Sequence, residues 1–208
     1  MKILLILSKG GKALFYNTIR FICNVVIHLL FRIKTYGLDN FPKNHAVIVY
    51  LNHKSMWDPV IIGCLLKRPI HFMAKEELFY NPLFGYIISK LNAFPVKRGT
   101  PDRKAIRKAL QVLDDRQVLG IFPEGTRSKD GNLQAPEPGV ALIAAKSKDA
   151  VLVPAAIIGN YKLFSRIEVR FGKSISFDKY RQGEKMSSSQ LKEISADLFT
   201  EVAKLMES

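Results

Sequence analysis

The chain has 208 residues and a formal net charge of +14, from 32 Lys and Arg residues against 18 Asp and Glu residues, yet 48% of its residues are hydrophobic. Its mean hydropathy is +0.04. This pairing excludes a disordered basic tail, which would be poor in apolar residues. It also excludes a polytopic membrane protein, which needs several uncharged apolar runs of about 20 residues. We expect one globular domain with apolar surface to spare, attracted to an anionic lipid surface or an anionic substrate.

The segment 13–31 predicts a helix with a broad apolar face and a narrow polar stripe. The polar residues of the stripe recur at steps of three or four, which is a helical spacing; they are Asn17, Arg20, Asn24 and His28. A core helix, a membrane span and a helix lying in the membrane interface all fit this pattern. Because the apolar face is so broad, and because Arg20 would be costly in hydrocarbon, we favour an interfacial helix. Residues 1–35 are thus predicted to be an N-terminal amphipathic membrane-anchoring segment.

The two cysteines, Cys23 and Cys64, lie inside apolar runs. Small secreted scaffolds held by disulfides contain many more cysteines than this. We therefore expect both residues to be reduced, packed thiols in a protein that faces the cytosol.

From residue 36 onward, short apolar runs bounded by Pro and Gly alternate with helical stretches. The predicted strands are 46–51, 70–74, 93–97, 118–122, 151–157 and 167–172, and the predicted helices are 59–66, 101–115, 139–147 and 188–206. Such alternation predicts an α/β domain over residues 36–208, with a mostly parallel central sheet flanked by helices. Ser187 and Gln190 have capping-box spacing before the last helix. The apolar segment 78–88 fits a second membrane element, a wall for an acyl chain or a buried helix.

The first candidate site follows the strand 46–51. His53 and Asp58 are too far apart in sequence to share a helix face, but a turn folds such a carboxylate back onto the imidazole. A neutral imidazole is a competent base near pH 7, and a carboxylate on its far nitrogen fixes the tautomer. The alternative is purely structural, because Ser55 and Asp58 also have capping-box spacing before an apolar run.

Two further loops follow predicted strands, and ligands of open α/β sheets gather at the carboxyl ends of strands. In the loop 122–128, Gly125 permits a tight turn, Glu124 is an acceptor for a hydroxyl, and Arg127 can clamp an anion. The loop 94–100 carries the adjacent cations Lys97 and Arg98. Each loop alone also fits a solvated surface turn.

Together these loops resemble the glycerolipid acyltransferase family, in particular the bacterial 1-acyl-glycerol-3-phosphate acyltransferases. The resemblance runs from about residue 36 to residue 172, with the motifs in the family's order. They are His53-x-x-x-x-Asp58, Phe94-Pro95-Val96-Lys97-Arg98-Gly99, Phe122-Pro123-Glu124-Gly125-Thr126-Arg127 and Val153-Pro154.

The resemblance implies an O-acyltransferase that acylates lysophosphatidate to phosphatidate in phospholipid synthesis. His53 would take the proton of the acceptor hydroxyl while Asp58 orients the ring, without an acyl-enzyme. The remaining motif residues would bind substrate: Glu124 and Gly125 the glycerol, Arg98 and Arg127 the phosphate, with Lys97 and Thr126 beside them. No metal or organic cofactor is implied, and the co-substrate would be acyl-CoA or acyl-[acyl carrier protein].

Three alternatives to lysophosphatidate keep the same chemistry: glycerol 3-phosphate, another lysophospholipid or a lyso-aminolipid. A different class is a non-catalytic basic protein bound to a membrane. Nucleic acid is not an expected partner, because Lys and Arg are spread along the whole chain and no nucleic-acid-binding motif is present. The expected partner surface is an anionic phospholipid membrane, and the expected location is the cytoplasmic face of the inner membrane, as a peripheral or monotopic protein.

Overall fold

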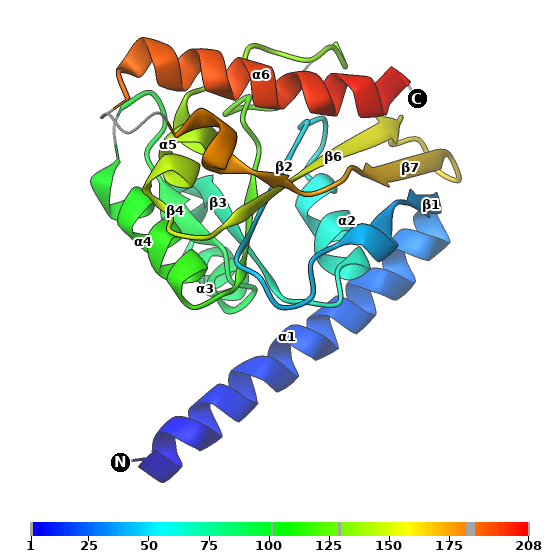
Figure 1. Ribbon diagram of the computed structural model, residues 1–208. Coiled ribbons are helices and arrows are strands. Elements are labelled where there is room, and N and C mark those ends of the chain that lie inside the picture. The colour runs from blue at the N-terminus through cyan, green and yellow to red at the C-terminus, as the bar shows by residue number, and fades with distance from the viewer. Residues whose placement is uncertain (1, 101, 129, 182–185, 208) are drawn as a thin grey trace.

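A mixed, mostly parallel sheet forms the centre of the computed structural model, which describes residues 2–100, 102–128, 130–181 and 186–207 (Figure 1). Among these residues eight strands pair in the order β1-β7-β6-β2-β5-β3-β4, with β8 beside β6. They are β1 (Arg32–Tyr36), β2 (Val47–Leu51), β3 (Ile70–Lys75), β4 (Phe94–Val96), β5 (Val118–Ile121), β6 (Val151–Gly159), β7 (Arg166–Phe171) and β8 (Ile175–Ser176). β6 runs antiparallel to β7 and β8, and the other pairs are parallel. The expected fold class is confirmed.

Helices cover both faces of the sheet. One face packs against α4 (Arg103–Asp114), α5 (Gly139–Lys146) and α6 (Ser188–Glu207), and the other against α1 (Lys2–Leu30) and α2 (Asp58–Leu65). Along β2, Ile48 and Tyr50 point to the first face, whereas Val49 and Leu51 point to the second. Because both faces are buried, the strand is apolar at every position, which explains the apolar runs of the sequence.

Two strands, β1 and β8, lack a clear signal in the sequence. β1 alternates exposed and half-buried residues because it is an edge strand, paired with β7 alone. It crosses the expected boundary between the anchor and the domain, so the sheet begins three residues before residue 35. β8 is two residues long. The predicted capping box of α6 is present: Ser187 N donates to Gln190 Oε1 (2.8 Å), and Gln190 N donates to Ser187 Oγ (3.2 Å).

α1 is one continuous helix that reaches well beyond the sheet at its N-terminal end (Figure 1). Tyr16 and Ile27 are buried against the domain, and Arg20 Nη2 donates to the carbonyl oxygen of Cys64 at 3.2 Å. The opposite side of the helix is apolar and exposed; it carries Leu14, Phe21, Ile22, Val25 and Leu29, which are 44–70% exposed. By length and composition Ala13–Leu30 is apolar enough to cross a membrane, with a mean hydropathy of 1.5, and only 11% of it is buried. A core helix would bury this face, so that alternative is wrong.

The segment 78–88 forms the end of a 3-10 turn, η2 (Glu76–Phe79), and most of α3 (Pro82–Lys90). Asn81 caps α3, since its Oδ1 accepts from Phe84 N at 3.0 Å. In α3, Gly85 is the buried residue, and Phe79, Ile87 and Ile88 of the segment are half-buried. Five other large apolar side chains are exposed by 39–72%; they are Leu78, Tyr80, Leu83, Phe84 and Tyr86. Of the three alternatives for this segment, the buried helix is therefore wrong.

Candidate active site

The loops that were singled out from the sequence lie at one edge of the sheet. β2, β3, β4, β5 and β6 run parallel to one another through neighbouring pairs. Their carboxyl ends therefore share an edge, and the loops 52–57, 97–100, 122–128 and 160–165 leave from it. This is the edge at which open α/β sheets bind their ligands.

His53 and Asp58 form a buried pair at the end of β2. His53 Nδ1 lies 2.7 Å from Asp58 Oδ2, and the two residues are 9% and 0% exposed. The chain turns after β2, and α2 begins at Asp58, so the first carboxylate of the helix points back at the imidazole. Among the described residues, only Nδ1 of this ring has a hydrogen-bond partner. An Nδ1–H held by the carboxylate leaves Nε2 as the basic nitrogen.

The Asp58 carboxylate is held by four donors. Besides the imidazole, Oδ2 accepts from Lys54 N (2.6 Å) and Ser55 N (2.7 Å), and Oδ1 accepts from the hydroxyl of Tyr161. Burial, first, and the Asp58 charge raise the pKa of Tyr161, so this hydroxyl stays protonated and donates. Local sequence carries no signal for Tyr161, because it reaches the site only through the pairing of β2 with β6.

Glu124 holds the loop 52–57 through the backbone of His53. Its Oε1 accepts from the backbone N–H of His53 at 2.7 Å and its Oε2 accepts from Gln134 N at 3.0 Å, and the residue is 5% exposed. The backbone N–H of Ser128 donates a hydrogen bond to the carbonyl oxygen of His53 at 2.8 Å. Burial raises the pKa of the Glu124 carboxyl, and the two accepted N–H bonds oppose that rise. The observed contacts of Glu124 are thus structural, and its expected contact with glycerol stays a prediction.

The imidazole also rests on an aromatic stack. The rings of His53 and Phe122 are stacked with centroids 4.0 Å apart, and Phe72 stacks on Phe122 at 5.6 Å. Gly120 makes room for this stack, since a Cβ there would lie 2.3 Å from Cε1 of Phe72. The packing on one face and the hydrogen bond of Nδ1 restrict how the ring of His53 can turn.

The loops 97–100 and 124–127 carry exposed or half-buried residues beside the site, which we call the rim: Lys97, Arg98, Gly125, Thr126 and Arg127. Three of them are exposed cations. Arg98 and Arg127 lie close enough to affect each other: partial burial lowers the pKa of Arg98, Glu77 raises it, and the charge of Arg127 lowers it further. Two guanidinium groups that repel each other favour an anion between them. Lys97 points elsewhere, with its Nζ 3.9 Å from Glu76 Oε2.

The other rim residues serve the loop's shape. Gly125 has φ +67°, in the left-handed region, and its N–H closes a turn onto the carbonyl oxygen of Phe122 at 3.0 Å. Thr126 is exposed beside it.

Within the described part of the chain, no group of three or more His, Cys, Asp or Glu residues is arranged to hold a metal ion.

Cys23 and Cys64 are free thiols, as expected, and Cys64 is buried. Burial raises the pKa of Cys64 to about 11, which leaves it protonated and unreactive near neutral pH.

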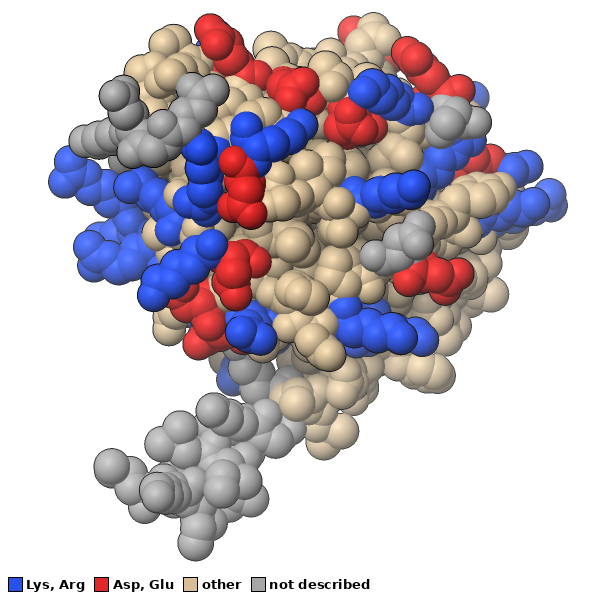
Figure 2. Space-filling model, in the orientation of Figure 1, with Lys and Arg blue, Asp and Glu red and all other residues tan. Residues whose placement is uncertain are grey.

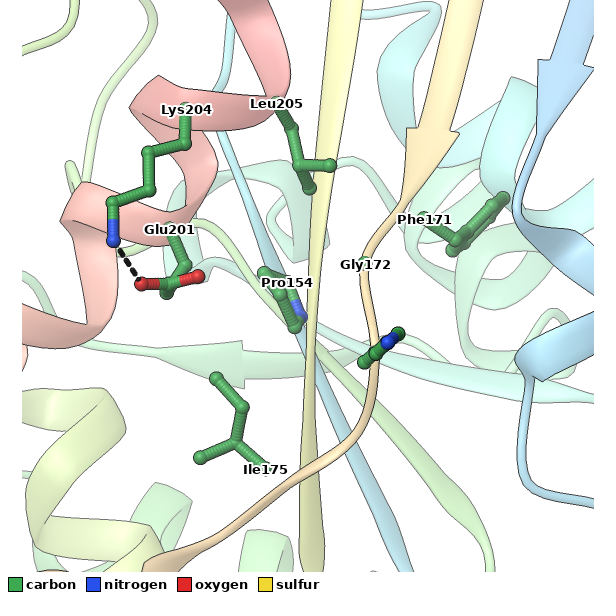
Figure 3. Close-up of a pocket in the computed structure, with 8 residues that line it drawn as sticks. Pro154, Phe171, Gly172, Ile175, Glu201, Lys204 and Leu205 are labelled. Atoms are coloured by element: carbon green, nitrogen blue, oxygen red, sulfur yellow. Dashed lines mark hydrogen bonds and ion pairs between the residues drawn. The ribbon is translucent and has the colours of Figure 1, made fainter. Parts of the chain in front are cut away.

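Pro154, which the sequence analysis grouped with the other motifs, lies away from the dyad. It lines an open pocket of about 420 Å³ under the C-terminal end of α6, with Phe171, Ile175 and Leu205 among its walls (Figure 3). Val153 and Pro154 alternate across the sheet, and Val153 belongs to the apolar cluster beneath α1 and α2. Lys204 and Glu201, 2.7 Å apart, form an ion pair at this pocket (Figure 3).

The positive charge is spread over the visible face and alternates with Asp and Glu (Figure 2). It is densest on the side where α4 lies; the exposed cations of that helix are Arg103, Lys104, Arg107 and Lys108. Most of the net charge therefore lies outside the site.

Known proteins resemble this chain in sequence and in fold. A family model described as Acyltransferase matches residues 32–158. The 1-acyl-sn-glycerol-3-phosphate acyltransferase of Bacillus subtilis is 34% identical over 136 residues, which are 65% of this chain and 67% of that protein. The protein of the same name from Streptococcus pneumoniae is 30% identical over 210 residues, which are 95% of this chain and 75% of that protein.

The fold recurs in the crystal structure of the 1-acyl-sn-glycerophosphate acyltransferase PlsC from Thermotoga maritima. The TM-score is 0.71 at 22% sequence identity, and the match covers 95% of this chain and 83% of that one. The family model spans β1 through most of β6, and hence the dyad and the loops 52–57, 97–100 and 122–128. On the family match and the two curated relatives, the chain belongs to the acyltransferase family.

Proposed function

We propose that the protein transfers an acyl chain from an acyl thioester to the free hydroxyl of lysophosphatidate, giving phosphatidate. The buried His53–Asp58 pair, with Nδ1 and Oδ2 2.7 Å apart, is the observation that carries this proposal. The names of the Bacillus and Streptococcus relatives support the choice of acceptor.

The geometry supports a direct transfer. Nε2 of His53 removes the proton of the acceptor hydroxyl as its oxygen attacks the thioester carbonyl carbon, and Asp58 stabilises the resulting imidazolium. The tetrahedral intermediate then collapses: the C–S bond breaks, and the imidazolium returns the proton to the leaving thiolate. The hydrogen bond to Asp58 and the stack on Phe122 orient the ring before the reaction, which lowers the cost of orientation.

We assign acceptor binding to the rim. Arg98 and Arg127 bind the phosphate of lysophosphatidate as guanidinium–phosphate pairs. Gly125, Thr126 and the free lone pairs of Glu124 face the glycerol, and Lys97 adds positive charge nearby. The same rim accepts glycerol 3-phosphate, so a panel of acceptors decides between them. Acyl-CoA or acyl-[acyl carrier protein] supplies the chain.

We also propose that the protein works on the cytoplasmic face of the cell membrane, attached through α1. The exposed apolar side chains of α1 and the segment 78–88 support a lipid contact, because soluble monomers rarely expose apolar patches of this extent. Anionic phospholipids fit the net charge of +14.

Thiol release from acyl thioesters tests the reaction. Purified protein in detergent is given lysophosphatidate, glycerol 3-phosphate, other lysophospholipids or a lyso-aminolipid. Wild type is compared with His53→Ala and with a matched control, His45→Ala, since His45 is exposed and lies before β2. We expect rapid release with lysophosphatidate, loss of nearly all turnover in His53→Ala, and none lost in the control.

The competing function is a non-catalytic basic protein bound to the membrane, which the exposed face of α1 also fits. Such a protein binds anionic vesicles but is indifferent to His53. If wild type releases thiol no faster than His53→Ala with every acceptor, the enzymatic proposal is wrong and the binding function stands.

A further inference from the structure

The loop between β6 and β7, residues 160–165, presents two large apolar side chains to solvent. Leu163 and Phe164 are each 61% exposed. Cations flank them, because Lys162 and Arg166 are exposed on either side. Adjacent exposed apolar residues between cations are costly in water, and they suit the boundary between lipid headgroups and acyl chains.

The loop is held rigidly in this shape. Phe164 has φ +59°, a left-handed conformation that is rare for a bulky residue and persists only where neighbouring contacts hold it. Its N–H donates to the carbonyl oxygen of Leu30 at 2.7 Å, and Ser165 N donates to Lys162 O at 3.0 Å. The apolar pair is therefore displayed by a fixed backbone rather than by a freely moving one.

The Leu30 contact ties the loop to the last turn of α1. Whether α1 lies in the membrane interface or crosses the bilayer, its C-terminal end emerges at the membrane surface, because the folded domain follows it directly. The loop is then at the same surface, and Arg32, exposed at the start of β1, adds another cation there; its N–H donates to Ser165 O at 2.9 Å.

We propose that the loop 160–165 inserts Leu163 and Phe164 into the lipid surface, as a second attachment point next to the active site. The inference rests on the membrane association proposed above. Tyr161, in the same loop, donates to Asp58. The second attachment therefore lies two residues from a group that holds the catalytic carboxylate, and it keeps the site edge close to a substrate that stays in the membrane.

Tryptophan probes test the contact. Three full-length variants are mixed with phosphatidylcholine–phosphatidylglycerol vesicles whose acyl chains are brominated: Phe164→Trp, Phe21→Trp on the exposed face of α1, and Lys192→Trp on exposed α6. The unsubstituted chain gives the background from Trp57. We expect quenching above background at positions 164 and 21 but not at 192.

The outcomes separate the two proposals. Quenching at position 21 with none at 164 beyond that at 192 overturns the lipid-inserting loop and leaves attachment through α1 intact. No quenching at 21 or 164 overturns both.

A second measurement uses the double variant Leu163→Ser/Phe164→Ser. We expect its apparent affinity for the anionic vesicles to fall by about tenfold, and its turnover of vesicle-embedded lysophosphatidate to fall with it. Its turnover of detergent-dispersed lysophosphatidate stays near wild type, which shows that the site is intact. Unchanged affinity for vesicles would contradict the proposal.

Discussion

Replacing Asp58 by asparagine removes one charge from the dyad and leaves its shape. Oδ2 of Asp58 accepts three N–H groups, and Oδ1 faces the hydroxyl of Tyr161. An asparagine keeps its carbonyl oxygen toward the three N–H donors and turns its NH₂ to the tyrosine, whose oxygen then accepts. Each of the four contacts of residue 58 remains a hydrogen bond, so the variant is expected to fold.

The loss of the charge is expected to lower kcat. Nδ1 and Oδ2 are 2.7 Å apart. With charge centres about 4 Å apart and an effective dielectric constant of about 20, the carboxylate attracts the imidazolium that forms during transfer by about 4 kcal/mol. Since 1.36 kcal/mol is tenfold in rate, kcat of Asp58→Asn should fall by about a thousandfold.

The assay is thiol release with saturating lysophosphatidate, together with thermal unfolding of each variant. Asp114→Asn is the matched control, because it removes the same charge from an exposed position on α4. A kcat for Asp58→Asn within tenfold of wild type, with normal unfolding, would refute the assignment of Asp58 as the partner of an imidazolium.

Three further predictions follow from the site. Arg98→Gln and Arg127→Gln should each raise KM for lysophosphatidate by about tenfold to a hundredfold with a smaller effect on kcat, because a charge-assisted bond contributes about 1.5–3 kcal/mol; an unchanged KM in both would remove the phosphate site from this rim. Tyr161→Phe should lower kcat by about threefold to tenfold, since one hydrogen bond is worth about 1 kcal/mol. An unchanged kcat in this variant would contradict the role of Tyr161 in holding Asp58. Gly120→Ala should lower Tm by about 5 °C, since displacing Phe72 costs about 2 kcal/mol, as differential scanning calorimetry would measure.

The predictable parts of the fold were those whose causes are local. The predicted strands β2, β5 and β6 are buried on both faces over nearly their whole length, so each is a continuous apolar run in the sequence. β1 has no such apolar run. Its residues from Arg32 to Tyr36 alternate between exposed and half-buried, because the strand lies at an edge of the sheet with one neighbour. The order of the strands depends on contacts between distant segments, and no local pattern carries it.

The residues of the site also divide into those that local sequence predicts and those that contacts between distant segments bring in. His53 and Asp58 were found together because one turn joins them. Tyr161 is 103 residues from Asp58 and enters through β6, which lies beside β2. Glu124 was singled out by its motif, but its observed contacts are with backbone N–H groups of His53 and Gln134. A motif shows that a residue type is needed at a position, whereas only the structure shows which atoms it contacts.

The direction of the strands links the two unusual features of the composition. Because β2, β3 and β6 end at one edge, the dyad, the η2–α3 segment and the loop 160–165 must all leave the sheet there. The exposed apolar side chains of the last two segments therefore belong to the same edge of the sheet as the imidazole, and the end of α1 contacts the loop 160–165 through Leu30. An enzyme for a water-soluble acceptor gains nothing from such surroundings. With the proposed acceptor and the proposed membrane attachment, they would allow the acyl chain to stay in lipid while its hydroxyl and phosphate reach His53 and the two arginines, so that the membrane itself would supply part of the substrate-binding surface.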